Sequence, residues 1–182
     1  MFHEMLIRCA APTLAGMKTG SLFTAPFEIR EQMTRELCTL NRSLCPKGLR
    51  LVPLRWRAGK ALLYLYRPAR LARDLRDPLA IRLLRECGYP GTDVDRALAH
   101  LIQRLGIQQD FPHEIGLFLG YPPADVDGFM HRRAHCKGCG LWKVYDDLDG
   151  ALRQFERCRR CTAAYLRRYA AGWTVDALAI AG

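Results

Sequence analysis

Hydrophobic residues recur at helical spacing in several parts of the chain, most clearly in residues 28–44. There Met33, Leu37 and Leu40 follow one another at spacings of four and three, which predicts an amphipathic helix. Proline is typical of the first position of a helix. Pro12 is followed by glycines at 16 and 20, so a second helix is predicted to begin at Pro12. Similar patterns predict helices over residues 93–105, 111–121, 123–133 and 151–170.

Other segments have the composition and alternation of β-strands. Residues 49–56 and 60–67 are rich in Leu, Val, Trp and Tyr and flank Arg57-Ala58-Gly59, which predicts a β-hairpin. Residues 21–25 predict a short edge strand that ends at Pro26, and residues 141–145 (LWKVY) predict a further strand. The expected fold is therefore α+β: a small antiparallel sheet of three or four short strands packed with about six helices, in a single domain over residues 1–182.

The composition is that of a globular protein with its own core. Of 182 residues, 49% are apolar and 25% are charged, which excludes a wholly disordered chain. No apolar run approaches the ~20 residues that cross a bilayer, and no secretory signal is readable, so no membrane partner is expected. We therefore expect a cytoplasmic protein whose eight cysteines are reduced thiols.

The chain is strongly basic, with 28 Lys and Arg against 18 Asp and Glu and a net charge of +10. Such a balance favours nucleic acid or an acidic protein as a partner. Tyr64 and Tyr66 lie among the basic residues of the predicted hairpin, as in a platform for single-stranded nucleic acid. The alternative is that the tyrosines pack in the core while the arginines solvate the surface. The candidate binding residues are Arg55, Arg57, Lys60, Arg67, Arg70 and Arg73.

Four cysteines have the spacing of a structural zinc site. Cys136 and Cys139 form one C-x2-C pair, and Cys158 and Cys161 follow as a second pair after eighteen residues. Neighbouring arginines and lysines are expected to lower the pKa of these thiols. Residues 136–161 thus form a possible metal-binding sub-region, in which His135 could replace one sulfur. The alternative is that the second pair lies within a helix and that Cys158 is a buried apolar residue.

A thiol and an imidazole form a second candidate site. Cys9 precedes the predicted helix start at Pro12, where backbone N–H groups favour a thiolate, and His113 precedes another predicted helix. If the two side chains meet, Cys9 is a candidate nucleophile and His113 a candidate base. The alternative is a packed cysteine and a histidine at the edge of the core. The sequence does not decide whether the protein is an enzyme.

Two segments resemble a known family. FPHEIGLFLGYPPADVDGF begins at Phe111 and GLWKVYDD at Gly140. Together with APTLAGMKTGSLF from Ala11 and LLYLYRPARLARDL from Leu62, they resemble an uncharacterised bacterial family, the domain-of-unknown-function family numbered 3793. The resemblance spans nearly the whole chain and implies no activity.

The resemblance bears on which cysteines form a site. The family pattern resembles this chain at Cys9, Cys139 and Cys161, whereas Cys136 and Cys158 are additional here. It therefore leaves open a site assembled from the three shared cysteines with His113 or His135.

Overall fold

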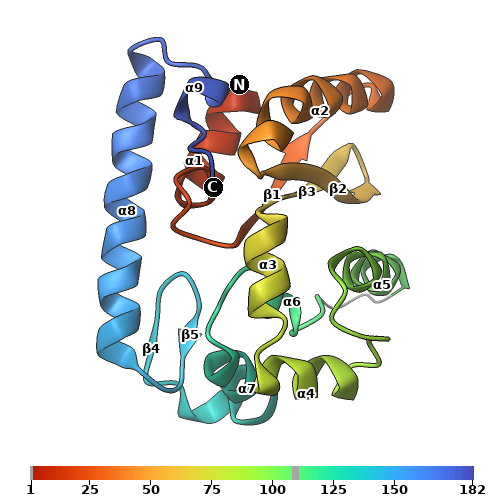
Figure 1. The fold of residues 1–182 in the computed structure, drawn as a ribbon, viewed down its shortest axis with the longest axis vertical. Coiled ribbons are helices and arrows are strands. Elements are labelled where there is room, and N and C mark those ends of the chain that lie inside the picture. The colour runs from red at the N-terminus through yellow and green to blue at the C-terminus, as the bar shows by residue number, and fades with distance from the viewer. Residues whose placement is uncertain (1, 108–110) are drawn as a thin grey trace. The chain divides into compact units, whose positions relative to one another are not determined.

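The computed structural model describes residues 2–107 and 111–182 of the chain, which form two compact units (Figure 1). Unit 1 comprises Met1–Ala69 and Cys158–Gly182, and unit 2 comprises Arg70–Arg157. That residues 1–182 act as one domain stays a prediction.

A three-stranded antiparallel sheet forms the centre of unit 1. Its strands β1 (Gly20–Pro26), β2 (Arg50–Arg57) and β3 (Lys60–Tyr66) lie in the order β1-β3-β2. The predicted hairpin is confirmed, because β2 and β3 pair across a turn in which Ala58 and Gly59 both have positive φ (47° and 69°). Such a turn matches the twist of the two strands. The edge strand predicted for residues 21–25 is confirmed as β1.

Helices form one apolar core with this sheet. They are α1 (Phe2–Leu14), α2 (Arg30–Leu44), the second half of α8 (Leu148–Ala170) and α9 (Val175–Leu178). The core between them is apolar; it includes Leu6, Ile7, Leu14, Met33, Leu37, Leu44, Phe23, Leu63, Leu65, Tyr165 and Leu178. A short 3₁₀ helix, η1 (Cys45–Lys47), follows α2 and ends at Gly48, whose φ is 74°. The amphipathic pattern at residues 28–44 thus forms the buried stripe of α2.

The prediction that a helix begins at Pro12 is wrong. Pro12 lies in the last turn of α1, and Leu6, Ile7, Ala10 and Leu14 of this helix are fully buried. Burial of such a face stabilises a helix more than the loss of one backbone hydrogen bond near its end destabilises it.

Unit 2 is mainly helical. Helix α3 (Pro68–Asp74) enters it, followed by α4 (Pro78–Glu86), α5 (Val94–Ile107), α6 (Ile115–Phe118), α7 (Pro123–His131) and the 3₁₀ helix η2 (Arg133–His135). The strands β4 (Gly138–Cys139) and β5 (Lys143–Val144) then pair as a small hairpin before α8 begins. The strand predicted over residues 141–145 is thus confirmed only as the two residues of β5, and β4 was not predicted.

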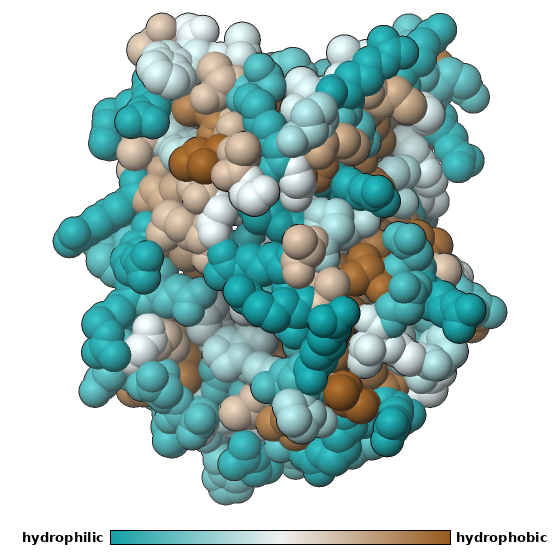
Figure 2. Space-filling model, in the orientation of Figure 1, coloured by the Kyte–Doolittle hydropathy of each residue, from teal (hydrophilic) through white to brown (hydrophobic). Residues whose placement is uncertain are grey.

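The predicted fold class is confirmed. The described part of the chain holds nine α-helices, a three-stranded antiparallel sheet and a separate two-stranded sheet. No described helix is long and apolar enough to cross a membrane. On the face drawn in Figure 2, polar side chains predominate and hydrophobic ones form small separate patches.

Candidate ligand-binding pocket

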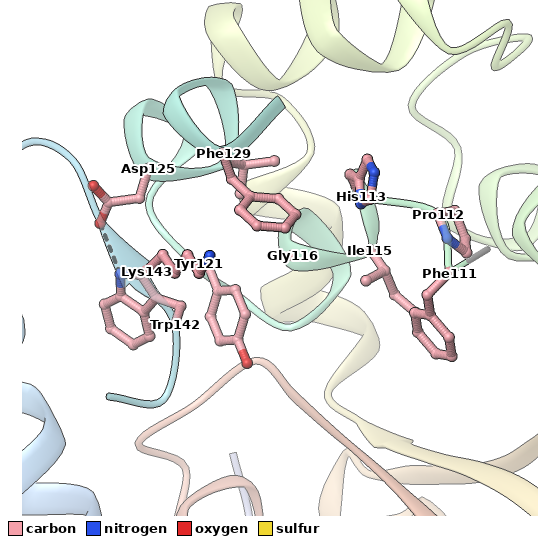
Figure 3. A pocket seen from close by; sticks show the side chains of 11 residues that line it. Phe111, Pro112, His113, Ile115, Gly116, Tyr121, Asp125, Phe129, Trp142 and Lys143 are labelled. Carbon is pink, nitrogen blue, oxygen red and sulfur yellow. Dashed lines mark hydrogen bonds between the residues drawn. The ribbon is translucent and has the colours of Figure 1, made fainter. Parts of the chain in front are cut away.

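Unit 2 contains a cavity of ≈ 530 Å³ between α6, α7 and the β4–β5 hairpin (Figure 3). Its wall includes four aromatic residues, and a histidine, a lysine and a carboxylate are among the other lining residues. The lining residues are Phe111, Pro112, His113, Ile115, Gly116, Tyr121, Asp125, Val126, Phe129, Trp142 and Lys143.

The carboxylate of Asp125 fixes one end of this wall. Asp125 lies in α7 and is 3% exposed. Its Oδ2 accepts a hydrogen bond from Nε1 of Trp142 at 2.7 Å, and its Oδ1 accepts from the backbone N–H groups of Tyr145 (2.7 Å) and Asp146 (3.0 Å). A buried carboxylate needs such partners. Asp125 thereby joins α7 to the hairpin and sets the orientation of the Trp142 indole.

Trp142 and Tyr121 form a continuous aromatic surface. Their rings stack with centroids 4.9 Å apart, and the Phe155 ring meets the indole edge-on, with centroids 4.6 Å apart. Gly116 permits this packing, because a Cβ there would lie 2.9 Å from Cγ2 of Val126 and 3.0 Å from Cδ2 of Tyr121. Burial raises the pKa of Tyr121 to about 12, so its phenol stays a neutral hydrogen-bond donor at neutral pH.

Phe129 forms the opposite part of the wall and holds two polar groups nearby. The His113 ring meets it edge-on with centroids 5.1 Å apart, and the Lys143 ammonium lies 5.5 Å from its centroid. A cation in this position is attracted to the ring face. Figure 3 shows Lys143 between Trp142 and Phe129, and His113 at the other end of the row.

A buried ion pair supports the segment that carries His113. Glu114 is 1% exposed; its Oε1 lies 2.6 Å from Nε of Arg104 and accepts a hydrogen bond from the Tyr89 hydroxyl at 3.0 Å. Arg104 also donates to the carbonyl of Cys87 at 3.2 Å. These contacts fix the backbone between Pro112 and α6, from which His113 and Ile115 reach the cavity.

The cavity has the chemistry of a binding site. Among the described residues that line it, the titratable side chains are His113, Tyr121, Asp125 and Lys143. The Asp125 carboxylate accepts three hydrogen bonds, and the Tyr121 phenol is neutral at neutral pH. What remains is an apolar space whose lining also holds the lysine and the imidazole.

The four cysteines of the predicted zinc site lie in different units. Cys136 and Cys139 are exposed in unit 2, where Sγ of Cys136 donates to the carbonyl of Gly138 at 3.0 Å. Cys158 and Cys161 are one turn apart on the part of α8 in unit 1, and Cys158 is 3% exposed. Among the described residues of each unit, no three His, Cys, Asp or Glu side chains form a group that could hold a metal. Zinc binding through these cysteines, or through Cys9, Cys139 and Cys161 with His113 or His135, stays a prediction.

The predicted lowering of thiol pKa values is wrong for Cys161. Burial, reinforced by the neighbouring Cys158, raises the pKa of Cys161 to about 11. The arginines beside it in the sequence extend from other faces of α8, whereas Cys161 packs against the apolar core of unit 1. Sequence proximity to a cation therefore does not give this thiol an electropositive surrounding.

Cys9 and His113 also lie in different units. Cys9 is inside α1, seven residues after the helix begins, so the expected stabilisation of a thiolate by a helix start does not apply to it. Burial raises the pKa of Cys9, although the Arg8 guanidinium acts in the opposite direction. His113 lies instead in the wall of the pocket in unit 2. A Cys9–His113 catalytic pair stays a prediction.

The pKa values lead to a prediction for thiol reactivity. In native protein at pH 8, iodoacetamide is expected to alkylate Cys161 and Cys87, whose pKa is also about 11, about 100-fold more slowly than exposed Cys136 and Cys139. Burial removes both the thiolate and the access that the reagent needs. Mass spectrometry of peptides from a time course measures each rate, and the same time course in denaturant, where the rates should converge, is the control. Cys9 outpacing the exposed cysteines would contradict this order and favour the thiol-enzyme hypothesis.

The predicted basic surface is only partly exposed. Arg57, Lys60 and Arg73 are exposed, and Arg55 and Arg70 are partly buried. Arg67 is 5% exposed and donates to the carbonyls of Thr13, Leu14 and Ile180, so its guanidinium has a structural role.

The two tyrosines of the predicted nucleic-acid platform are buried as well. Tyr64 and Tyr66 stack on each other, with ring centroids 4.7 Å apart, and are 1% and 2% exposed. The alternative stated for them, packing in the protein interior, is therefore the one observed.

Sequence reasoning missed most of the pocket residues. It identified His113 but assigned no role to Tyr121, Asp125, Phe129 or Trp142. The available signal was the pair of unusual segments that begin at Phe111 and Gly140, since all eleven lining residues belong to them.

Comparison with known proteins gives one match. The model of a family described as "Protein of unknown function (DUF3793)" matches residues 6–179. No curated protein and no solved structure matches the chain.

Proposed function

Because the chain belongs to the DUF3793 family of proteins of unknown function, we propose a function from the site itself: unit 2 binds a small planar molecule in its aromatic pocket. The observation that carries this proposal is the cavity of ≈ 530 Å³ walled by Phe111, Tyr121, Phe129 and Trp142. Ligand pockets typically measure about 300–1,000 Å³ and combine apolar walls with a few polar groups.

The rigidity of the wall supports binding of a flat molecule. Trp142 is fixed by its hydrogen bond to Asp125 and by contacts with Tyr121 and Phe155. Rings whose orientation is set before binding lose little conformational entropy when a ligand stacks on them. Aromatic pairs also favour offset-stacked or edge-on contacts, which a planar ligand can make with these side chains.

The polar groups of the pocket support a role in orienting a ligand. Three N–H donors occupy the Asp125 carboxylate, so this group anchors the wall. His113 and Lys143 lie beside Phe129, where they can contact polar atoms of a bound molecule.

Binding of a neutral planar probe tests the proposal. In a W56F/W173F variant, which leaves Trp142 as the only tryptophan, titration with 2-naphthamide is expected to change the fluorescence saturably. Saturation-transfer NMR of the same probe with the unaltered protein provides an independent measurement. Phe129→Ala is expected to weaken binding by about 10-fold, because it removes one aromatic wall.

Phe27→Ala is the matched control for this experiment. Phe27 is also half-buried and also makes an edge-on aromatic contact, with Trp56 at 5.0 Å, but it belongs to unit 1 and is not among the described lining residues of the cavity. Its variant, made in the unaltered background and followed by NMR, should bind the probe normally. The absence of saturable binding, or equal weakening by both substitutions, would contradict the proposed function.

Two functions predicted from the sequence stay proposals beside this one. Zinc binding is supported by the spacing of the two C-x2-C pairs. Binding of nucleic acid or an acidic protein is supported by the charge of unit 1, which has 15 Lys and Arg against five Asp and Glu, whereas unit 2 has thirteen of each. A cytoplasmic location is supported by the eight cysteines, all of which are free thiols.

A further inference from the structure

We infer that the ligand of the pocket is a planar aromatic monocarboxylate, whose ring lies against Trp142, Tyr121 and Phe129 and whose carboxylate meets the Lys143 ammonium. This inference rests on the proposed function and adds the chemical class of the ligand. The aromatic walls select a flat apolar body, and the polar groups at the edge of the cavity select its charge.

Lys143 is placed to receive an anionic group. Lys143 is exposed on β5, yet its ammonium lies over the Phe129 ring, 5.5 Å from the ring centroid. It forms no ion pair with any residue in the described ranges 2–107 and 111–182. The ring face holds the ammonium beside the cavity but cannot neutralise its charge. A ligand carboxylate can do so with a charge-assisted hydrogen bond.

The charges of the lining favour one negative charge on the ligand. Lys143 is the one lysine or arginine among the described lining residues. Asp125 lies at the end of the wall away from His113 in Figure 3, and three N–H groups stabilise its carboxylate. A single ammonium matches a monocarboxylate, whereas a phosphate dianion would lack a second permanent cation here.

Two further groups can orient the same ligand. The Tyr121 phenol is a neutral donor, since burial raises its pKa to about 12, and Figure 3 shows its hydroxyl pointing away from α7. His113 lies at the opposite end of Phe129 from Lys143 in the same view. A ring seated along Phe129 therefore has a cation at one edge and an imidazole at the other.

Matched acid and amide probes test this inference. Affinities of 2-naphthoate and 2-naphthamide, which have the same ring system, are measured by isothermal titration calorimetry for the unaltered protein, Lys143→Met and Lys143→Arg. We expect the acid to bind about 10-fold more tightly than the amide. Lys143→Met should remove that preference and leave amide binding within about 2-fold, and Lys143→Arg should retain it. Lys137→Met, which removes a lysine near the hairpin but outside the lining, is the control and should preserve the preference.

The outcomes separate this inference from the proposed function. Equal binding of acid and amide by the unaltered protein would overturn the inference while the proposed function stands. A preference for the acid that survives Lys143→Met would also overturn it, because the charge would then be recognised elsewhere. Failure of both probes to bind would overturn the proposed function and the inference together. Tighter binding of 2-naphthyl phosphate than of 2-naphthoate, lost in Lys143→Met, would overturn the choice of a carboxylate.

Discussion

Replacing Asp125 by alanine is expected to lower the free energy of unfolding of unit 2 by about 3–5 kcal/mol. The substitution leaves three donors without their acceptor: Nε1 of Trp142 and the backbone N–H groups of Tyr145 and Asp146. Each buried donor that loses its partner costs about 1–3 kcal/mol. The same change releases the Trp142 indole, so binding of the naphthalene probes should weaken as well.

Asp125→Asn distinguishes the hydrogen bonds from the volume of the side chain. An amide keeps the size of the carboxylate but replaces one acceptor by an NH₂ donor. Because N–H groups face both oxygens, either orientation of the amide places a donor against a donor. We therefore expect Asp125→Asn to lose about 2–3 kcal/mol, most of the effect of alanine.

The control lies two residues further along the same helix. The Asp127 side chain is partly exposed and lies near Arg82 (3.0 Å) and His131 (3.1 Å). Asp127→Asn is therefore expected to lower the free energy of unfolding by less than about 1 kcal/mol. Denaturant unfolding followed by Trp142 fluorescence in the W56F/W173F background reports on unit 2. Equal effects of Asp125→Asn and Asp127→Asn would show that the buried carboxylate does not anchor the hairpin.

The secondary structure predicted from local signals was largely correct. The stripe of Met33, Leu37 and Leu40 became the buried face of α2, and Ala58-Gly59 formed the turn between β2 and β3. In both cases the residues that give the sequence signal are the same residues that form the element, and they lie only a few positions apart. A helical stripe or a two-residue turn acts within one element, so it can be recognised without knowledge of the rest of the fold.

The predictions failed in two segments, one in which a distant residue determines the backbone and one in which a local turn was overlooked. The strand expected over residues 141–145 stops at Val144, because the N–H groups of Tyr145 and Asp146 donate to Asp125 instead of to a neighbouring strand. The helix expected over residues 111–121 is limited to Ile115–Phe118, and Gly120 ends it with a φ of 73°. No pattern in residues 141–145 reveals the first interaction, since its partner Asp125 lies about 20 residues away. The turn at Gly120 is local, because the N–H groups of Gly120 and Tyr121 donate to the carbonyls of Leu117 and Gly116, and a glycine is the usual residue at such a helix end.

The pocket was unpredictable because segments that are distant in the sequence build it. Its wall is built from α7, the loop before α6 and the β4–β5 hairpin, and only their packing brings Phe129 and Trp142 to one cavity. Sequence reasoning favoured cysteine spacing, because metal ligands have a recognisable local pattern. An apolar cavity has no such pattern: its aromatic residues resemble those of any core until the structure shows which of them face open space.

Replacing Arg67 by methionine is expected to lower the free energy of unfolding of unit 1 by about 3–5 kcal/mol. Nε of Arg67 donates to the carbonyl of Thr13 at 2.9 Å, and Nη2 donates to the carbonyls of Leu14 (2.9 Å) and Ile180 (2.7 Å). Methionine preserves most of the side-chain volume but removes all three donors. The end of α1 and the C-terminal segment would lose the group that connects them.

Arg67→Lys and Arg57→Met decide whether geometry or charge carries this effect. A lysine keeps the charge but lacks the planar fork that reaches three carbonyls, so it should restore less than half of the lost stability. Arg57 is an exposed cation at the hairpin turn, and Arg57→Met should cost less than about 0.5 kcal/mol.

Denaturant unfolding followed by Trp56 and Trp173 fluorescence in a W142F background measures the stability of unit 1. Hydrogen exchange at the Ile180 amide, which donates to the carbonyl of Leu14 at 3.0 Å, reports on the C-terminal segment and should accelerate in Arg67→Met alone. If Arg67→Met instead shows unchanged exchange and full stability, Arg67 has no structural role, and its charge is again a candidate for binding an acidic partner.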